Sequence, residues 1–178
     1  MQQSVPITVT SHLDTVPYFS PVPYLRIGNG KIYNPYNTPK DFSFWFTVVD
    51  LADLSVPYSE AFEDNLNVPA NLQRHLQPGA CLVVSTYNAY ARNFPQGDLY
   101  ALLVSLGSGE KLLSLEQAVT QLGTSAFYGF SYIVAGTIGS EEPALEAFSQ
   151  STSTFLTFTF QWSDVLKHYL PARGPQLS

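Results

Sequence analysis

The strongest constraint on the fold is a strand followed by a helix, between residues 81 and 107. The run Cys81-Leu82-Val83-Val84 follows Pro78-Gly79 and has the unbroken apolar character of a buried strand. After a polar, aromatic loop, Asp98 is placed to cap a helix, because a carboxylate accepts free backbone N–H groups. One apolar stripe and a glycine stop complete this helix: Leu99, Leu102, Leu103, Leu106 and Gly107. The stretch is therefore a unit of the core.

Strand-like patterns recur along the rest of the chain. Gly28-Asn29-Gly30 separates two short β-forming runs and predicts a hairpin. Pro6 places a strand over 5–10 at a sheet edge, where proline is tolerated. Further strands are expected at 42–51, with a partner at 55–62, at 125–135, and at 154–162, where apolar and polar residues alternate.

Capping residues predict the other helices. A short helix begins at Asn67 or Val68 with Pro69 in its first turn, where the missing N–H costs nothing. Ser114 and Gln117 form a capping-box pattern for a helix that Gly123 ends. Residues 164–170 are expected to form a last helical turn. The sequence therefore predicts two or three short helices.

The length of 178 residues indicates one domain with an appended segment at each end. Residues 1–23 are rich in proline and are expected to form an extended arm, residues 24–170 a single β-rich domain, and residues 171–178 a tail. Exposing the apolar residues of the arm to water is unfavourable. We therefore expect at least one terminal segment to dock on a neighbouring subunit. The apolar residues of the arm are Val5, Ile7, Val9, Tyr18 and Phe19.

Composition excludes several classes of function. The net charge is −6 and the 8 Lys and Arg form no basic stripe, which argues against nucleic-acid binding. No apolar run reaches the roughly 20 residues of a membrane span. The first residues have no basic and apolar regions typical of a signal peptide, so synthesis in the cytoplasm without export by such a peptide is expected. Cys81 is the single cysteine, which rules out an intrachain disulfide.

No catalytic, metal or cofactor residue is predicted. The three histidines, His12, His75 and His168, have no local metal-ligand spacing, and no Gly-x-Ser-x-Gly motif occurs. Residues 107–111 lack the full phosphate-loop pattern and follow a helix, so we interpret them as an interhelical turn. A small hydrolase remains a third hypothesis, with no site residue assigned.

The loop after the central strand carries the candidate contact residues Tyr87, Tyr90, Arg92 and Asn93. Aromatic, guanidinium and amide groups on one loop suit the stacking of a sugar or a contact with another protein. The alternative interpretation is a tyrosine-rich surface loop without a ligand.

The middle of the chain resembles the interleukin-like EMT inducer family, also called the GG domain, over residues 24–136. That domain also occurs in a glycosyltransferase stem region and in some tailed-phage fibre proteins. The resemblance implies a compact domain of two antiparallel sheets flanked by helices, without catalytic activity. The disulfide cysteines of the secreted animal members are absent. The stretches that carry it are 47–51, Ala61-Phe62-Glu63-Asp64, 72–76, 78–84, 102–108 and Ser125-Ala126-Phe127-Tyr128-Gly129.

We therefore expect an α+β fold of antiparallel sheets, sandwich-like, flanked by two or three short helices. The leading hypothesis for function is a non-catalytic structural or adaptor module, bound to other protein subunits in a homo- or hetero-oligomeric assembly. A tailed-phage tail, baseplate or fibre is the expected assembly, which places the protein in a virion or a large extracellular assembly. The alternative is a carbohydrate-binding domain with a glycan as its ligand.

Overall fold

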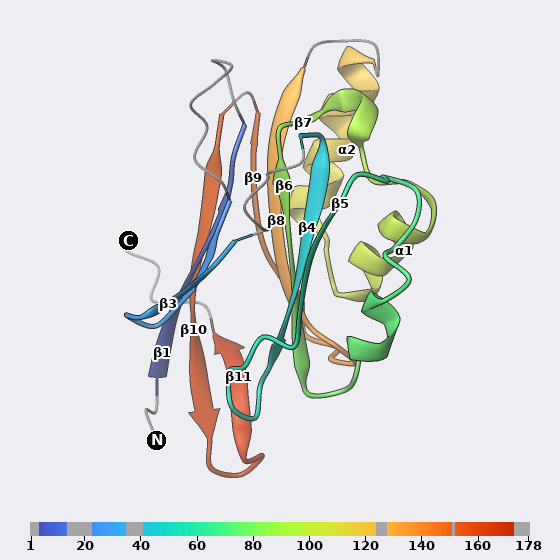
Figure 1. The fold of residues 1–178 in the computed structure, drawn as a ribbon. Coiled ribbons are helices and arrows are strands. Elements are labelled where there is room, and N and C mark those ends of the chain that lie inside the picture. Colours follow the sequence, from blue (N-terminus) through green and yellow to red (C-terminus); the bar gives the residue numbers. More distant parts are fainter. Residues whose placement is uncertain (1–3, 14–22, 35–40, 124–127, 151, 173–178) are drawn as a thin grey trace.

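Two antiparallel sheets lie face to face, and two helices cover the outer face of the second sheet (Figure 1). The computed structural model describes residues 4–13, 23–34, 41–123, 128–150 and 152–172. This arrangement confirms the coarse expectation of antiparallel sheets with short helices in a sandwich-like α+β fold. Residues 14–22 of the predicted arm, with the apolar Tyr18 and Phe19, lie outside the described residues.

The first sheet, which we call sheet A, has the strand order β11-β10-β1-β2-β3. β1 pairs with β10 along its whole length and with β2 on its other side. It is therefore a middle strand, and the predicted edge position is wrong. Pro6 is tolerated because β2 pairing has ended at Ile27, and the Pro6 carbonyl accepts the Gly28 N–H at 2.8 Å. The strands are β1 (Ser4–Ser11), β2 (Leu25–Ile27), β3 (Lys31–Tyr33), β10 (Thr154–Ser163) and β11 (His168–Ala172).

The predicted boundary between an N-terminal arm and the domain, at residue 23, does not match the described residues, because β1 is part of sheet A. Val5, Ile7 and Val9 point into the space between the sheets and are 6%, 1% and 0% exposed. These residues bury their apolar surface within their own chain, so no neighbouring subunit is needed to cover them. The expected hairpin between β2 and β3 is confirmed, with Ile27 opposite Lys31.

The second sheet, sheet B, has the order β5-β4-β6-β8-β7, and β9 pairs with β8 beside this path. The predicted strands over 42–51, 55–62, 81–86 and 125–135 correspond to β4, β5, β6 and β8, with shifted ends and with 124–127 outside the described residues. β9 was not predicted. The strands are β4 (Ser43–Asp50), β5 (Tyr58–Phe62), β6 (Ala80–Tyr87), β7 (Ala89–Tyr90), β8 (Gly129–Thr137) and β9 (Leu145–Gln150).

The helices of the described chain are two α-helices and two short 3₁₀ helices. α1 ends as predicted, but Gln96 occupies the N-cap and Asp98 lies in the first turn. α2 begins four residues before the predicted Ser114, whose hydroxyl instead donates to the Glu110 carbonyl within the helix at 2.8 Å. The helices are η1 (Leu72–His75), η2 (Ala91–Asn93), α1 (Gly97–Ser105) and α2 (Glu110–Leu122).

Sheet B separates two apolar cores. Alternate residues of a strand point to opposite faces. Leu82 and Val84 of β6 therefore pack under the helices, while Cys81 and Val83 pack toward sheet A. The leucine stripe of α1 largely follows its prediction, since Leu99, Leu103 and Leu106 are buried on the helix side of the sheet and Leu102 is partly buried there. A strand with both faces covered explains why the 81–84 run is continuously apolar.

The C-terminal part forms a hairpin. Residues 164–170 were expected to make a helical turn, but 164–167 are the turn between β10 and β11. The alternation that was predicted for 154–162 is confirmed, with Phe158 and Phe160 facing the core. Pro171 belongs to β11, and residues 173–178 of the predicted tail lie outside the described residues. The N–H of Tyr169 donates to the Leu51 carbonyl at 2.8 Å, which ties this hairpin to sheet B.

Candidate functional site

The predicted contact residues lie where β6 turns into β7 and η2. Asn88 has a positive φ of 46°, which reverses the chain after β6 and allows Tyr90 to pair with Gly129 of β8. The Asn88 N–H donates to the His12 carbonyl at 2.8 Å, and its side-chain amide donates to Asp41 at 2.8 Å. The loop is therefore anchored on two other segments.

Tyr87 is not available for a surface contact. It is the last residue of β6 and only 5% exposed. An isolated parallel β-bridge joins Tyr87, at the end of β6, to His12. The sequence placed Tyr87 with the loop residues because they are neighbours along the chain, whereas the strand directs its side chain into the protein.

Tyr90 and Arg92 come together over a third residue, Phe42, which the sequence did not predict. The rings of Phe42 and Tyr90 are 5.5 Å apart between centroids. The Arg92 guanidinium carbon lies 4.9 Å from the Phe42 centroid and 6.0 Å from that of Tyr90, which are distances of cation–π contact. Phe42 has a positive φ of 62°, an unfavourable value for an aromatic residue that the surrounding structure must hold.

Asn93 has a positioning role in this cluster. Its side-chain oxygen accepts the backbone N–H of Tyr90 at 3.0 Å. Asn65 adds support, because its amide donates to the Phe94 carbonyl at 2.7 Å. Arg92 is exposed, and Tyr90 and Phe42 are partly exposed. The result is a small, rigid aromatic and guanidinium surface that can stack on a flat apolar face of a ligand.

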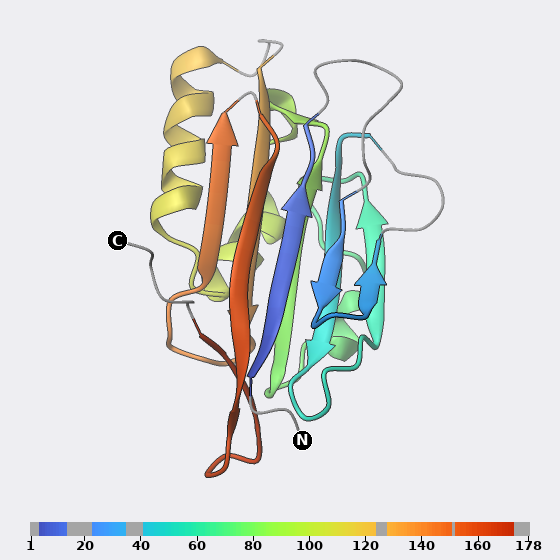
Figure 2. The ribbon, with the colours of Figure 1, turned by 90° about the vertical axis from the view of Figure 1, so that its left-hand side faces the viewer.

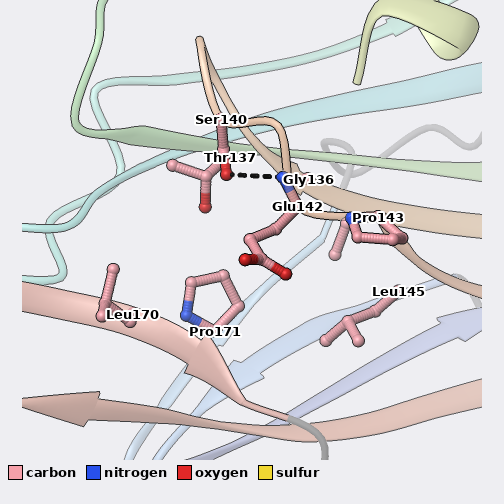
Figure 3. Close-up of a pocket in the computed structure, with 9 residues that line it drawn as sticks. Gly136, Thr137, Ser140, Glu142, Pro143, Leu145, Leu170 and Pro171 are labelled. Atoms are coloured by element: carbon pink, nitrogen blue, oxygen red, sulfur yellow. Dashed lines mark hydrogen bonds between the residues drawn. The ribbon is translucent and has the colours of Figure 1, made fainter. Parts of the chain in front are cut away.

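A cavity opens between β11 and the turn that joins β8 to β9 (Figure 3). Its volume is about 590 Å³, which is in the size range of ligand pockets. Most of its wall is apolar, with three hydrogen-bonding or charged side chains. The lining residues are Ala135, Gly136, Thr137, Ser140, Glu142, Pro143, Leu145, Leu170 and Pro171.

Among the described lining residues, Glu142 provides the only charge. Its carboxylate points across the opening toward Pro171, and its backbone N–H donates to the Ser140 hydroxyl at 3.1 Å (Figure 3). Within the described part of the chain, the one salt bridge joins Lys111 and Glu110. Glu142 thus has no cationic partner there, and the cavity suits an apolar group that carries a positive charge.

A second carboxylate, Glu146 of β9, is fully used in the fold. It accepts the backbone N–H groups of Gly109, Lys111 and Leu112, at 3.0, 3.3 and 3.3 Å. It also accepts the hydroxyl of the buried Tyr132 at 2.6 Å. Burial, followed by the charge of Glu146, raises the pKa of Tyr132. This arrangement caps α2 from a distant strand and leaves no group free for chemistry.

The three histidines lie on separate elements. His12 follows β1, His75 stacks on Tyr58 with ring centroids 5.1 Å apart, and His168 begins β11. Partial burial lowers the pKa of His12, because it penalises the charged form. Over the described residues, no group of three or more His, Cys, Asp or Glu is placed to hold a metal ion.

Comparison with known proteins identifies no family for the chain. No family model matches the sequence, and no curated protein matches it at a significant level. No helix in the described ranges is long and apolar enough to cross a membrane. The candidate sites therefore have to be interpreted from their own geometry.

Proposed function

We propose that this chain is a non-catalytic structural or adaptor module that binds another protein subunit through the outer face of sheet A. The observation that carries the proposal is the composition of this face. In the register of the sheet, residues directly opposite each other share a face. The outward side chains of the described strands include Ser4, Pro6, Thr8, Arg26, Ile32, Phe155, Thr157, Thr159 and Gln161.

Arg26 is the one charged side chain among these residues. Ile32 and Phe155 are 55% and 67% exposed, and hydroxyl and amide side chains fill the area between them. Figure 2 looks on to this face, and no helix or other strand lies in front of it. Depletion of charge with exposed aromatic and aliphatic groups is the composition of an interface core.

The dimensions of the face also suit a protein partner. Five strands about 4.8 Å apart are about 19 Å wide, and eight paired residues of β1 and β10 extend about 26 Å. The product is about 500 Å², more than half of the roughly 800 Å² that one partner contributes to a standard interface. A tailed-phage tail, baseplate or fibre is the assembly that the family resemblance suggests, and we retain it as part of the proposal.

A substitution in the centre of the face tests the proposal. Thr157 is exposed and pairs with Thr8, so Thr157→Arg introduces a charge without disturbing the core. The tagged chain purified from its own source should carry a stoichiometric partner in native mass spectrometry, and Thr157→Arg should remove it. Thr120→Arg, on an exposed position of α2, is the matched control and should retain the partner.

Two results would refute this function. One is a complex with a different protein chain that Thr157→Arg leaves intact. The other is a hydrolytic activity that disappears when His12, His75 and His168 are all replaced by Gln, because the proposal gives none of them a catalytic role.

Carbohydrate binding is the second candidate, and the stacked cluster of Phe42, Tyr90 and Arg92 favours it. Sugars stack their apolar faces on aromatic rings. In that case Tyr90→Ala should abolish glycan-induced NMR shifts in the loop, while Tyr33→Ala, a partly exposed tyrosine of β3, should leave them unchanged. Absence of shifts at millimolar glycan would exclude this candidate.

A further inference from the structure

The hairpin of β10 and β11 carries an apolar tip. Its turn, residues 164–167, lies at the far end of the hairpin, which extends beyond the body of the protein (Figures 1 and 2). Val165 and Leu166 are 89% and 53% exposed there. Two adjacent aliphatic side chains on a projecting turn form an unfavourable solvent contact that a binding partner would remove.

The turn holds this tip in one conformation. The Lys167 N–H donates to the Ser163 carbonyl at 2.8 Å, and the Leu166 N–H donates to the Ser163 hydroxyl at 3.1 Å. The Trp162 indole N–H donates to the Asp164 carboxylate at 3.1 Å. A turn that is ordered in this way loses little conformational entropy when it binds.

Lys167 occupies a position that would suit glycine better. Its φ is 58°, in the left-handed region where a side chain is unfavourable and glycine is not. Lys167 is exposed, and in the described ranges it has no salt bridge. The tip therefore presents two aliphatic side chains and the Lys167 ammonium group, while its one carboxylate, Asp164, accepts the Trp162 indole N–H.

The cavity between β11 and the β8–β9 turn has the complementary chemistry. Leu145, Leu170 and Pro171 supply apolar walls, and Glu142 supplies a carboxylate with no cationic partner in the described chain (Figure 3). Its volume of about 590 Å³ has room for two aliphatic side chains. The Lys167 ammonium group of the tip and the Glu142 carboxylate of the cavity carry opposite charges, and both have apolar surface beside them.

The tip and the cavity also lie on the same hairpin. Leu166 is four residues from Leu170, so the two lie at most about 13 Å apart along the chain. A patch that contains both a projection and its complementary cavity is self-complementary. Two copies related by a two-fold axis can then each insert a tip into the cavity of the other.

We propose that two copies of this chain form a two-fold dimer by reciprocal insertion of the 164–167 turn into this cavity. Leu166 contacts Leu145 and Leu170 of the second copy, and the Lys167 ammonium group pairs with the Glu142 carboxylate. The contact is separate from the centre of the outer face of sheet A, so this inference and the proposed function can fail independently.

Charge reversal is the decisive test, measured by sedimentation equilibrium over a concentration series of the full chain. Glu142→Lys and Lys167→Glu should each weaken the dimer, and each change acts twice because of the symmetry. We expect about a hundredfold increase in Kd if each contact loses about tenfold. The control Glu141→Lys reverses the charge of the exposed neighbour and should leave Kd unchanged.

Restoration of the pair provides the specific readout. The double variant Glu142→Lys with Lys167→Glu, and equally a mixture of the two single variants, should dimerise to within about threefold of the original chain. In the mixture, each copy supplies the charge that the other needs. A merely structural role of either residue would give no such rescue.

Two further variants separate association from folding. Lys167→Gly removes the ammonium group and relieves the positive φ, so it should weaken the dimer without lowering the melting temperature of the monomer. Leu166→Asp should also weaken it, while Leu113→Asp, at a similarly exposed leucine of α2, should not. A chain that stays monomeric at high concentration, or a dimer unaffected by either charge reversal, would overturn the proposal.

Discussion

The replacement of Glu146 by Gln tests how a distant strand determines where α2 begins. The Glu146 Oε2 atom accepts hydrogen bonds from the N–H groups of Gly109 and Lys111. The Oε1 atom accepts hydrogen bonds from the Leu112 N–H and from the Tyr132 hydroxyl. Gln has nearly the same size but offers one acceptor and one NH₂ donor. With the NH₂ group in the place of Oε2, it faces two N–H donors; in the place of Oε1, it faces the Leu112 N–H, while the Tyr132 hydroxyl can turn to accept from it and donate to Ser108.

The magnitude follows from these contacts. A hydrogen bond to a charged group contributes about 1.5–3 kcal/mol, and a negative charge at a helix N-terminus contributes about 0.3–1 kcal/mol. Because one acceptor oxygen remains and water reaches the exposed side of the Gly109 contact, we expect Glu146→Gln to lower the free energy of unfolding by about 3 kcal/mol. Glu146→Ala, which leaves no acceptor, should lower it at least as much.

Urea denaturation followed by circular dichroism measures this change. With a slope of about 2 kcal/mol per molar urea, a loss of 3 kcal/mol moves the midpoint by about 1.5 M. Glu141→Gln is the control and should change stability by less than about 0.5 kcal/mol, since it alters an exposed carboxylate without these contacts. If Glu146→Gln changes the free energy of unfolding as little as this control does, the capping argument is refuted.

Three other perturbations have defined outcomes. Leu103→Ala should cost about 2–5 kcal/mol in urea denaturation, because Leu103 of α1 is fully buried between the helix and sheet B, and a cost near zero would contradict this core. Burial raises the pKa of Cys81 to about 12, and burial with the nearby Glu146 raises the pKa of Tyr132, so both groups bind protons more tightly in the folded state. The urea midpoint should therefore fall as the pH rises above about 9. A midpoint that stays constant would contradict this linkage. Gly136→Ala places a Cβ 2.6 Å from the backbone oxygen of Leu106 and should cost about 2–3 kcal/mol in thermal denaturation. The control Gly30→Ala meets open space and should change stability little. Equal effects of the two variants would refute the steric argument.

Local patterns predicted the elements whose partners lie close in sequence or whose faces are simple. The leucine stripe of α1 and the glycine turn of the β2–β3 hairpin belong to this group. The prediction of Ser114 as a cap was wrong because Glu146, more than thirty residues later, satisfies the N–H groups of the preceding turn. A carboxylate on another strand leaves no signal near the helix that it caps.

Pairing between distant segments accounts for the other differences. Pro6 indicated an edge strand, yet β1 lies in the middle of sheet A. The proline is tolerated there because β2 pairs only with residues 7–9 and does not reach Pro6. Phe42 was absent from the predicted site because it is separated from Tyr90 by more than forty residues, and Tyr87 was included because strand orientation cannot be assigned at the end of an apolar run. Tyr90 and Arg92 were found together because they are neighbours in both sequence and space.

The pairing of β1 with β10 sets the order in which the protein can fold during synthesis. Ser11 at the end of β1 lies opposite Thr154, so roughly 140 residues must be made before this pairing can begin. At about 5–20 residues per second, β1 is without this partner for about 7–30 seconds. During that time Val5, Ile7 and Val9 cannot be covered by β10. Sheet B and its helices, which are made from the middle of the chain, can assemble first, and sheet A can close only when the first strand and one of the last are joined.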